Sequence, residues 1–307
     1  MIEISRLTKR FAQHTVVDDL SFSVRPGEVL GFLGPNGAGK STTMKMLTGF
    51  LAPSSGTATI HGFDIQTHTL QAQRLIGYLP EGAPCYGDMR VRAFLEFIAE
   101  VRGYRGAEKR ERVARVVAQL ELEGVREQSI ETLSKGFKRR VGVAQAILHD
   151  PRVLILDEPT DGLDPNQKYQ VRELIGQLAK ERIVIISTHI LEEVSALCSR
   201  ALVIANGRLL ADDTPFELER RSRYHQAVTL VGDSPLDREA LAALPGVAGV
   251  EDNPLEHSVT VLAQPGQVIF PQVNALIAAH GWRIRELDVE RGRLDEVFRS
   301  LTRGEAA

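Results

Sequence analysis

The stretch Gly34-Pro35-Asn36-Gly37-Ala38-Gly39-Lys40-Ser41, followed by Thr42, decides the fold of this chain of 307 residues. It matches the pattern GxxxxGK[ST], and it stands in the context that this pattern requires. The apolar run 29–33 reads as a buried strand before it, and a helical pattern begins near Lys40. Glycines let backbone N–H groups turn inward without Cβ clashes, which makes a nest for an anion. The stretch therefore predicts a binding site for a nucleoside triphosphate.

Lys40 and Ser41 provide the polar side chains of this phosphate loop (residues 34–41). Lys40 would bring a cation to the β- and γ-phosphates, and the Ser41 hydroxyl would ligate Mg²⁺. The helix that starts here adds the positive end of its dipole. The alternative is a glycine-rich turn with a chance lysine, and the strand before and the helix after it argue against that alternative.

An acidic pair, Asp157 and Glu158, ends a second apolar run at 153–156. A buried strand can deliver Asp157 to the Mg²⁺ shell at its carboxyl end, where open α/β sheets place their ligands. Glu158 points elsewhere and could polarise a water molecule for attack on the γ-phosphate. A solvated acidic turn is the alternative, and the phosphate loop upstream makes the catalytic interpretation stronger.

Composition excludes some classes of protein. The formal net charge is −3, from 37 basic and 40 acidic side chains, so the chain lacks the basic field of a non-specific nucleic-acid binder. No apolar stretch approaches the roughly 18 residues of a membrane span. We expect no nucleic-acid partner, and any work on a membrane must pass through a partner protein.

Strand-sized and helix-sized patterns alternate along the first two thirds of the chain. Residues 2–29 predict short strands with a turn, residues 91–148 are helical in pattern, and residues 167–179 predict a helix before the strand 183–187. Such alternation is typical of a mainly parallel sheet with helices on its faces.

The pattern changes after the charged segment 219–223, a candidate hinge. Beyond it we expect a strand, a helix, two strands, a helix, a strand and a last short helix, at 227–231, 235–244, 247–251, 258–262, 267–280, 282–289 and 294–301. This order suggests a small α+β module of the ferredoxin-like type. The predicted domains are 1–220 and 225–307.

The run Leu133-Ser134-Lys135-Gly136-Phe137 resembles the signature motif of the ATP-binding cassette (ABC) ATPases. Ser134 is a good helix N-cap and Gly136 permits close backbone approach, so this helix start is a second anion site. The resemblance covers residues 1–218 and implies an α/β P-loop ATPase with an antiparallel β subdomain and a helical subdomain. It also implies ATP and Mg²⁺ as cofactors, with two ATP molecules held between two subunits.

The resemblance assigns further residues. Phe11 is similar to the aromatic residue that stacks on adenine, although it could instead be a core aromatic. The segment 161–164, which ends in Asp164, resembles the loop that crosses the dimer interface beside the nucleotide. His189 matches the histidine that contacts the γ-phosphate, and Glu158 matches the catalytic base.

The chain departs from the family pattern at three positions. Glu81 stands where a glutamine is usual, and its carboxylate can still offer oxygen to Mg²⁺. Lys135 and Phe137 replace the usual glycine and glutamine. This set resembles the bacterial branch that includes gliding-motility and antibiotic-export ATPases, and it leaves the hydrolysis rate open.

The family receives a helix of the membrane subunit in the region that corresponds to 81–103. We hypothesise an apolar groove there, with Cys85, Tyr86, Met89 and Phe94 in its lining. The alternative is that these side chains are ordinary core of the helical subdomain.

The resulting expectation is an ATPase that powers transport, with export favoured by the branch. Its partners would be an integral membrane permease and a second copy of this chain or another ATPase subunit. It would lie in the cytoplasm, on the inner face of the cell membrane. The alternative is a soluble ABC ATPase of translation or DNA repair, but the two cassettes, coiled-coil insertions or basic arms typical of those relatives are not evident in this sequence. A P-loop kinase would not need the signature motif or His189.

Overall fold

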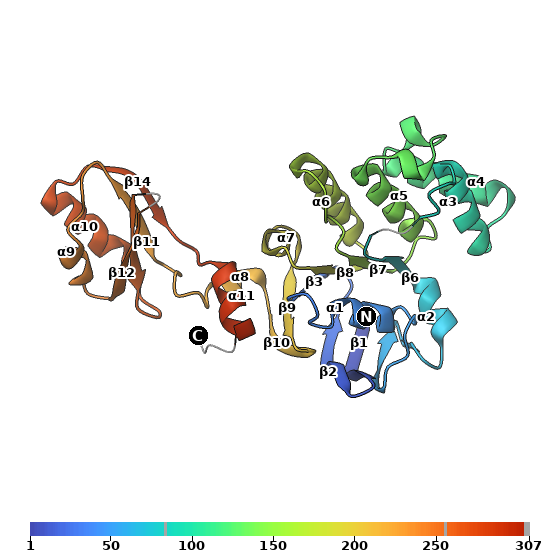
Figure 1. The fold of residues 1–307 in the computed structure, drawn as a ribbon, viewed down its shortest axis with the longest axis horizontal. Coiled ribbons are helices and arrows are strands. Elements are labelled where there is room, and N and C mark those ends of the chain that lie inside the picture. The colour runs from blue at the N-terminus through green and yellow to red at the C-terminus, as the bar shows by residue number, and fades with distance from the viewer. Residues whose placement is uncertain (83–84, 255–256, 304–307) are drawn as a thin grey trace. The chain divides into compact units, whose positions relative to one another are not determined.

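The computed structural model describes residues 1–82, 85–254 and 257–303. The chain divides into two compact units, Met1–Asp212 and Asp213–Ala307 (Figure 1). The division lies earlier than the break expected near residue 220. Helix α8 (Pro215–Glu219) falls in the second unit because it packs against α11 (Leu294–Arg303).

A six-stranded sheet with the order β10-β9-β3-β8-β7-β6 forms the centre of the first unit. Strand β3 pairs in parallel with β8 and β9, and β7 pairs in parallel with β8 and β6. The strands are β3 (Val29–Leu33), β6 (Ile76–Leu79), β7 (Val153–Asp157), β8 (Ile183–Thr188), β9 (Arg200–Ala205) and β10 (Arg208–Asp213). Every residue of β3, β7 and β8 is buried, as continuous apolar runs in a covered parallel sheet require. The predicted mainly parallel core sheet is confirmed.

A second sheet, of order β2-β1-β4-β5, lies beside the first (Figure 1). It consists of β1 (Ile2–Phe11), β2 (His14–Val24), β4 (Ser55–Ile60) and β5 (Phe63–Asp64). The prediction of short strands before residue 29 was wrong, because β1 and β2 have 10 and 11 residues. Shifts of register along their pairing absorb residues that break the alternation, so each strand continues where the sequence pattern stops.

Helix α1 (Lys40–Leu47) lies between the two sheets (Figure 1). Its buried residues Met44, Met46 and Leu47 join side chains of both sheets in one apolar core. The phosphate loop therefore leads directly into a helix that is anchored in this core.

The helical pattern over 91–148 resolves into three helices, α3 (Val91–Val101), α4 (Gly106–Gln119) and α5 (Lys135–Ile147). Two 3₁₀ turns, Glu123–Val125 and Ile130–Thr132, separate α4 from α5. Helix α5 lies so close to β6 that a Cβ on Gly77 would come within 2.1 Å of the Ala146 carbonyl oxygen.

The first unit also contains α2 (Thr69–Leu75), α6 (Pro165–Ala179) and α7 (Leu191–Leu197). Helix α6 begins earlier than predicted because Asp164 caps it and Pro165 occupies its first turn. Throughout the described ranges, every helix falls short of the length and apolar character that a membrane crossing requires.

The second unit has the expected order of strands and helices. These are β11 (Val228–Gly232), α9 (Arg238–Ala242), β12 (Val247–Asn253), β13 (Ser258–Ala263), α10 (Phe270–His280) and β14 (Ile284–Val289). The strands pair antiparallel in the order β12-β13-β11-β14, over an apolar core that includes Val228, Leu241 and Val273. Helix α9 is shorter than predicted, because the Asp237 side chain caps it by accepting a hydrogen bond from the Ala240 N–H.

Candidate functional site

The strand register brings the predicted site residues to one edge of the core sheet. Leu33 pairs with Thr188, and Asp157 pairs with Ser187. Leu79, at the end of β6, pairs with Leu156. The segments that follow β3, β6, β7 and β8 therefore start side by side at the carboxyl edge, which is where open α/β sheets bind ligands.

The phosphate loop follows β3, and its backbone requires or favours glycine at several positions. Gly39 has a φ of 101°, in the left-handed region. A Cβ at Gly34 would lie 2.5 Å from the Ile204 carbonyl oxygen. Helix α1 begins without a side-chain cap, so its first N–H groups remain available to an anion.

Lys40 is only 6% exposed, and its amino group is already held by the loop. Its Nζ donates to the carbonyl oxygens of Gly34, at 2.7 Å, and Pro35, at 3.3 Å. Burial lowers the pKa of Lys40, and the charges of Glu158 and Asp157 oppose that shift. The cation is thus positioned inside the loop, beside the acidic end of β7.

Asp157 is 1% exposed, and its Oδ1 has no hydrogen-bond partner among the described residues. The hydroxyl of its register neighbour Ser187 also lacks one. A buried carboxylate oxygen without a donor fits a cation, and Mg²⁺ commonly takes only one or two protein carboxylates, with phosphate oxygens and water completing its shell. Among the described residues, no group of three or more His, Cys, Asp or Glu side chains could hold a metal ion by itself.

Glu158 is 8% exposed and has a φ of +50°, which is unusual for a residue with a side chain. Its N–H donates to the Ser187 carbonyl oxygen at 2.9 Å. Nδ1 of His189 lies 3.0 Å from both carboxylate oxygens of Glu158. The structure therefore brings Glu158 and His189 into direct contact at the carboxyl edge.

Thr188 and Glu193 hold the backbone around His189, and sequence reasoning gave neither a role. Thr188 Oγ1 accepts a hydrogen bond from the Ile190 N–H and donates one to Glu193 Oε2, each at 3.0 Å. Glu193 is 1% exposed, and its burial raises its pKa. A carboxylate inside a helix carries no sequence sign of being buried, so only the structure could identify it.

The signature turn (residues 134–137) starts helix α5, as the sequence predicts. Ser134 Oγ accepts a hydrogen bond from the Phe137 N–H at 3.3 Å, which confirms its role as N-cap. Gly136 is buried, and a Cβ there would lie 2.7 Å from the Gln167 side chain. Ser134 itself is exposed, and no hydrogen bond between described residues joins this turn to the phosphate loop.

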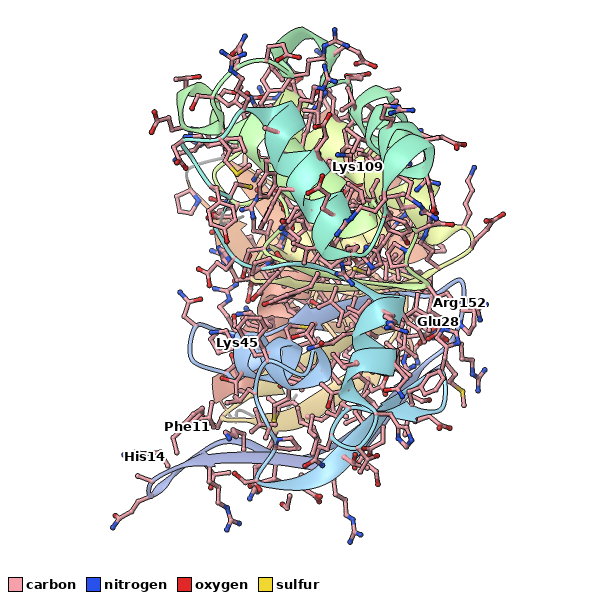
Figure 2. All side chains as sticks on the ribbon, turned by 90° about the vertical axis from the view of Figure 1, so that its right-hand side faces the viewer. Phe11, His14, Glu28, Lys45, Lys109 and Arg152 are labelled. Atoms are coloured by element: carbon pink, nitrogen blue, oxygen red, sulfur yellow. The ribbon has the colours of Figure 1, made fainter. Side chains whose placement is uncertain are left out.

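The remaining predicted residues are Phe11, Asp164 and Glu81. Phe11 is at the tip of the β1–β2 hairpin beside His14 (Figure 2) and is 46% exposed, so it is not a core aromatic. Asp164 Oδ1 accepts from the Gln167 N–H at 2.9 Å and forms a capping box at the start of α6. Glu81 is exposed.

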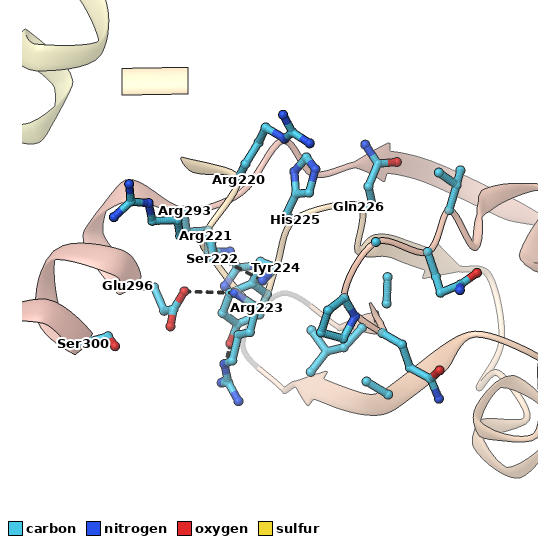
Figure 3. Close-up of a pocket in the computed structure, with 18 of the residues that line it drawn as sticks. Arg220, Arg221, Ser222, Arg223, Tyr224, His225, Gln226, Arg293, Glu296 and Ser300 are labelled. Atoms are coloured by element: carbon cyan, nitrogen blue, oxygen red, sulfur yellow. Dashed lines mark hydrogen bonds between the residues drawn. The ribbon is translucent and has the colours of Figure 1, made fainter. Parts of the chain in front are cut away.

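A cavity of about 1270 Å³ lies in the second unit (Figure 3). Its lining includes five arginines, and each of these forms an ion pair with a carboxylate. They are Arg220, Arg221, Arg223, Arg293 and Arg299, paired with Glu217, Asp213, Glu251, Glu290 and Asp295. Because their charges are already balanced, the cavity is not assigned as an anion site. It also contains none of the predicted catalytic residues.

The parallel sheet, the glycine-rich loop before α1 and the acidic end of β7 define a nucleoside triphosphatase of the P-loop class. Comparison with known proteins gives the family. The family model described as ABC transporter matches residues 17–161, and this chain belongs to the ABC transporter ATP-binding proteins.

Two relatives extend over nearly the whole chain. The linearmycin resistance ATP-binding protein of Bacillus subtilis is 32% identical over 306 residues, 98% of each chain. The Nod factor export ATP-binding protein I of Cupriavidus metallidurans is 33% identical over 312 residues, 98% of this chain and 97% of that one. A solved structure of an ATP-binding subunit of an ABC transporter matches with a TM-score of 0.65 and 30% identity, over 72% of this chain and 92% of that chain. The chain is the ATP-binding subunit of an ABC transporter and hydrolyses ATP for transport.

Proposed function

We propose that this subunit closes with a second ATPase subunit, either another copy or a related chain, around two Mg-ATP complexes and so drives export by a separate membrane permease. The observation that carries the proposal is the exposed signature turn. The phosphate loop is built entirely within one chain, whereas the N-terminus of α5 presents its capped start outward. A second anion site that faces away from its own chain suits the nucleotide of a facing subunit.

The names of the two relatives support export. One is described by resistance to linearmycin and the other by export of Nod factor. We propose that the present subunit belongs to the same bacterial branch as gliding-motility and antibiotic-export ATPases.

Residues at the carboxyl edge would divide the chemistry between them. Lys40 would exchange its bonds with the Gly34 and Pro35 carbonyls for bonds to the β- and γ-phosphates. Ser41 and Asp157 would hold Mg²⁺, which neutralises the phosphate charge when bound, and Glu81 would offer a further oxygen. Glu158 would accept the proton of the attacking water, oriented by its contact with His189.

Two further roles remain proposals. Phe11, being exposed on its hairpin, would stack on adenine for about 1–3 kcal/mol. The capping box of Asp164 would keep the segment 161–164 in the shape that reaches the facing subunit and its nucleotide.

We propose that the permease docks a helix against the aromatic surface around α3. Tyr86 is 57% exposed and packs edge-on against Phe97, with ring centroids 5.7 Å apart. Phe94 is buried, so it supports this surface from below, and Cys85 and Met89 are half-buried. Part of the predicted groove, residues 83–84, lies outside the described residues.

The docking surface can be tested by pull-down of the permease. Tyr86→Glu should lose most of the bound permease, because a charge would be buried against an apolar helix. Tyr169→Glu is the matched control, since Tyr169 is 65% exposed on α6, away from α3. Full retention of the permease by Tyr86→Glu would remove this surface from the proposal.

The second unit is proposed as a ferredoxin-like accessory domain, 225–307, that follows an ATPase domain, 1–220. Two observations support this type. The strands lie in the order β12-β13-β11-β14, and along the chain α9 connects β11 to β12 and α10 connects β13 to β14. We further propose that the subunit lies in the cytoplasm on the inner face of the membrane, held there by the permease, and that it has no nucleic-acid partner.

Glu158→Gln tests the proposed function directly. Loss of the base should lower ATP turnover by about 100-fold or more, while the bound nucleotide keeps its contacts. The variant should therefore accumulate as a dimer with Mg-ATP, measured by light scattering, and return to monomer with Mg-ADP. Glu181→Gln, at an exposed position, should behave as the unaltered protein. A Glu158→Gln protein that binds Mg-ATP and stays monomeric would rule out a sandwich made of two copies of this chain.

A further inference from the structure

Arg139 is a buried cation that the chemistry above does not use. It lies on α5, one turn beyond the start of the helix, and is only 6% exposed. Its Nη1 has no hydrogen-bond partner, and no carboxylate within the described ranges forms an ion pair with it. Burying a guanidinium without a close partner is costly, and such a group persists only where surrounding charges compensate it.

The start of α5, the helix that carries Arg139, packs against the segment that follows Glu158. A Cβ on Gly162 would lie 3.6 Å from the Lys135 side chain, and Gly136 contacts the side chain of Gln167. The first turns of α5 therefore rest on the segment 161–167. Burial lowers the pKa of Arg139, and Asp161 exerts the strongest opposing charge, followed by Glu158.

The turn from Glu158 to Asp161 needs support. Glu158 has the left-handed backbone that L-residues avoid, with a φ of +50°. One backbone bond ties it to Ser187, and the Asp161 N–H closes the turn on the Glu158 carbonyl oxygen at 3.3 Å. Strained residues persist only where their surroundings hold them, and Arg139 is a buried cation on the helix whose first turns rest against the segment that follows this turn.

We propose that Arg139 is a positioning residue for hydrolysis: its buried guanidinium attracts Asp161, clamps the turn 158–161 against α5, and so fixes the Glu158 carboxylate. The inference rests on the proposed role of Glu158 as base. Arg139 does not touch the phosphate loop by any hydrogen bond of the described residues, so its effect is on turnover and not on ATP binding.

Steady-state ATPase measurements on Arg139→Gln test this role. The kcat should fall about tenfold or more, because a small displacement of a catalytic group costs that much, whereas the KM for ATP should change less than about twofold. Arg139→Lys keeps the charge and should recover a large part of the kcat. A residue that only fills space would show no such rescue by charge.

A double-mutant cycle tests whether Asp161 is the carboxylate through which Arg139 acts. Asp161→Asn alone should also lower the kcat, because it leaves Arg139 uncompensated, and the double variant Arg139→Gln/Asp161→Asn should be no slower than Arg139→Gln. Arg140→Gln is the matched control: this neighbouring arginine pairs with exposed Glu121 instead, and its kcat should stay within about twofold.

Two results would overturn the inference: an unchanged kcat in Arg139→Gln, or additive losses in the double variant. If Arg139→Gln fails to fold, Arg139→Lys and Asp161→Asn carry the test, and a wild-type kcat in Asp161→Asn overturns it. The unaltered protein and Glu158→Gln are assayed alongside. If Glu158 is not the base, Glu158→Gln will retain its ATP turnover, and this result is independent of how the Arg139 variants behave.

Discussion

The first unit contains two helix starts that can attract phosphate, and they are built in opposite ways. Helix α1 has no side-chain cap, follows a loop with glycines in strained or crowded positions, and encloses a buried lysine. Helix α5 is capped by the exposed Ser134, and its buried Gly136 is packed against Gln167 of the same chain.

The contrast shows which site is complete. The uncapped start of α1 leaves N–H groups that can donate to an anion, and Lys40 lies beside them. At the start of α5, the Ser134 side chain already accepts a hydrogen bond from the Phe137 N–H, and Ser134 is exposed. This contrast supports the proposal that one site binds a triphosphate within a single chain and that the other contributes to the nucleotide of a facing subunit.

The largest expected effect is at the complete site. Lys40→Ala should weaken ATP binding by about 100-fold or more, since losing a buried charge contact costs about 3 kcal/mol. Lys45→Ala is the control on the same helix, because Lys45 is exposed (Figure 2). Calorimetric titration with Mg-ATP measures both variants, and near-normal binding by Lys40→Ala would break the distinction drawn between the two helix starts.

The incomplete site should show the reverse behaviour. Ser134→Arg places a bulky charged side chain at the exposed start of α5, so it should leave ATP binding to the monomer within about threefold while abolishing the closed dimer in the Glu158→Gln background. Ser234→Arg, in an exposed loop of the second unit, is the control. Light scattering in the presence of Mg-ATP measures whether each variant is a monomer or a dimer. A Ser134→Arg protein that still dimerises would contradict an outward-facing site.

The smallest effect concerns the far end of α5, where His149 ties the helix to the sheet. His149 Nε2 lies 3.0 Å from the Ile76 carbonyl oxygen, and burial, with Arg102 nearby, lowers the pKa of His149 from 6.5 to about 4. The unfolded chain then binds the proton more readily than the folded one, so stability is lost as pH falls below about 6.5 and the loss is complete near 4.

When the pH falls from ~7 to ~5, protonation of His149 in the unfolded chain should lower the free energy of unfolding by about 2 kcal/mol. His149→Gln can keep a donor for Ile76 and should remove most of that dependence. Urea unfolding at the two pH values measures it, with His68→Gln, at an exposed residue, as the control. An equal loss of stability in His149→Gln would show that other groups cause the pH dependence.

Local patterns predicted the elements that depend on neighbours in sequence. The phosphate loop, the strand ending in Asp157 and the cap at Ser134 each follow from backbone rules that act over a few residues. The order of elements in both units was predictable for the same reason. The length of β1 and β2 was not, because pairing with a partner strand decides where irregular strands end.

What the sequence determined by itself was the class of chemistry, because the nest, the lysine and the acidic strand end are each encoded in a contiguous run. What only the tertiary structure decided was which distant groups meet: His189 against Glu158, Glu193 bonded to Thr188, and the start of α5 packed on the segment 161–167. Those contacts arise from sheet register and helix packing between segments far apart in the chain. Burial, which gives an ordinary arginine or glutamate its importance, is a property of the folded whole.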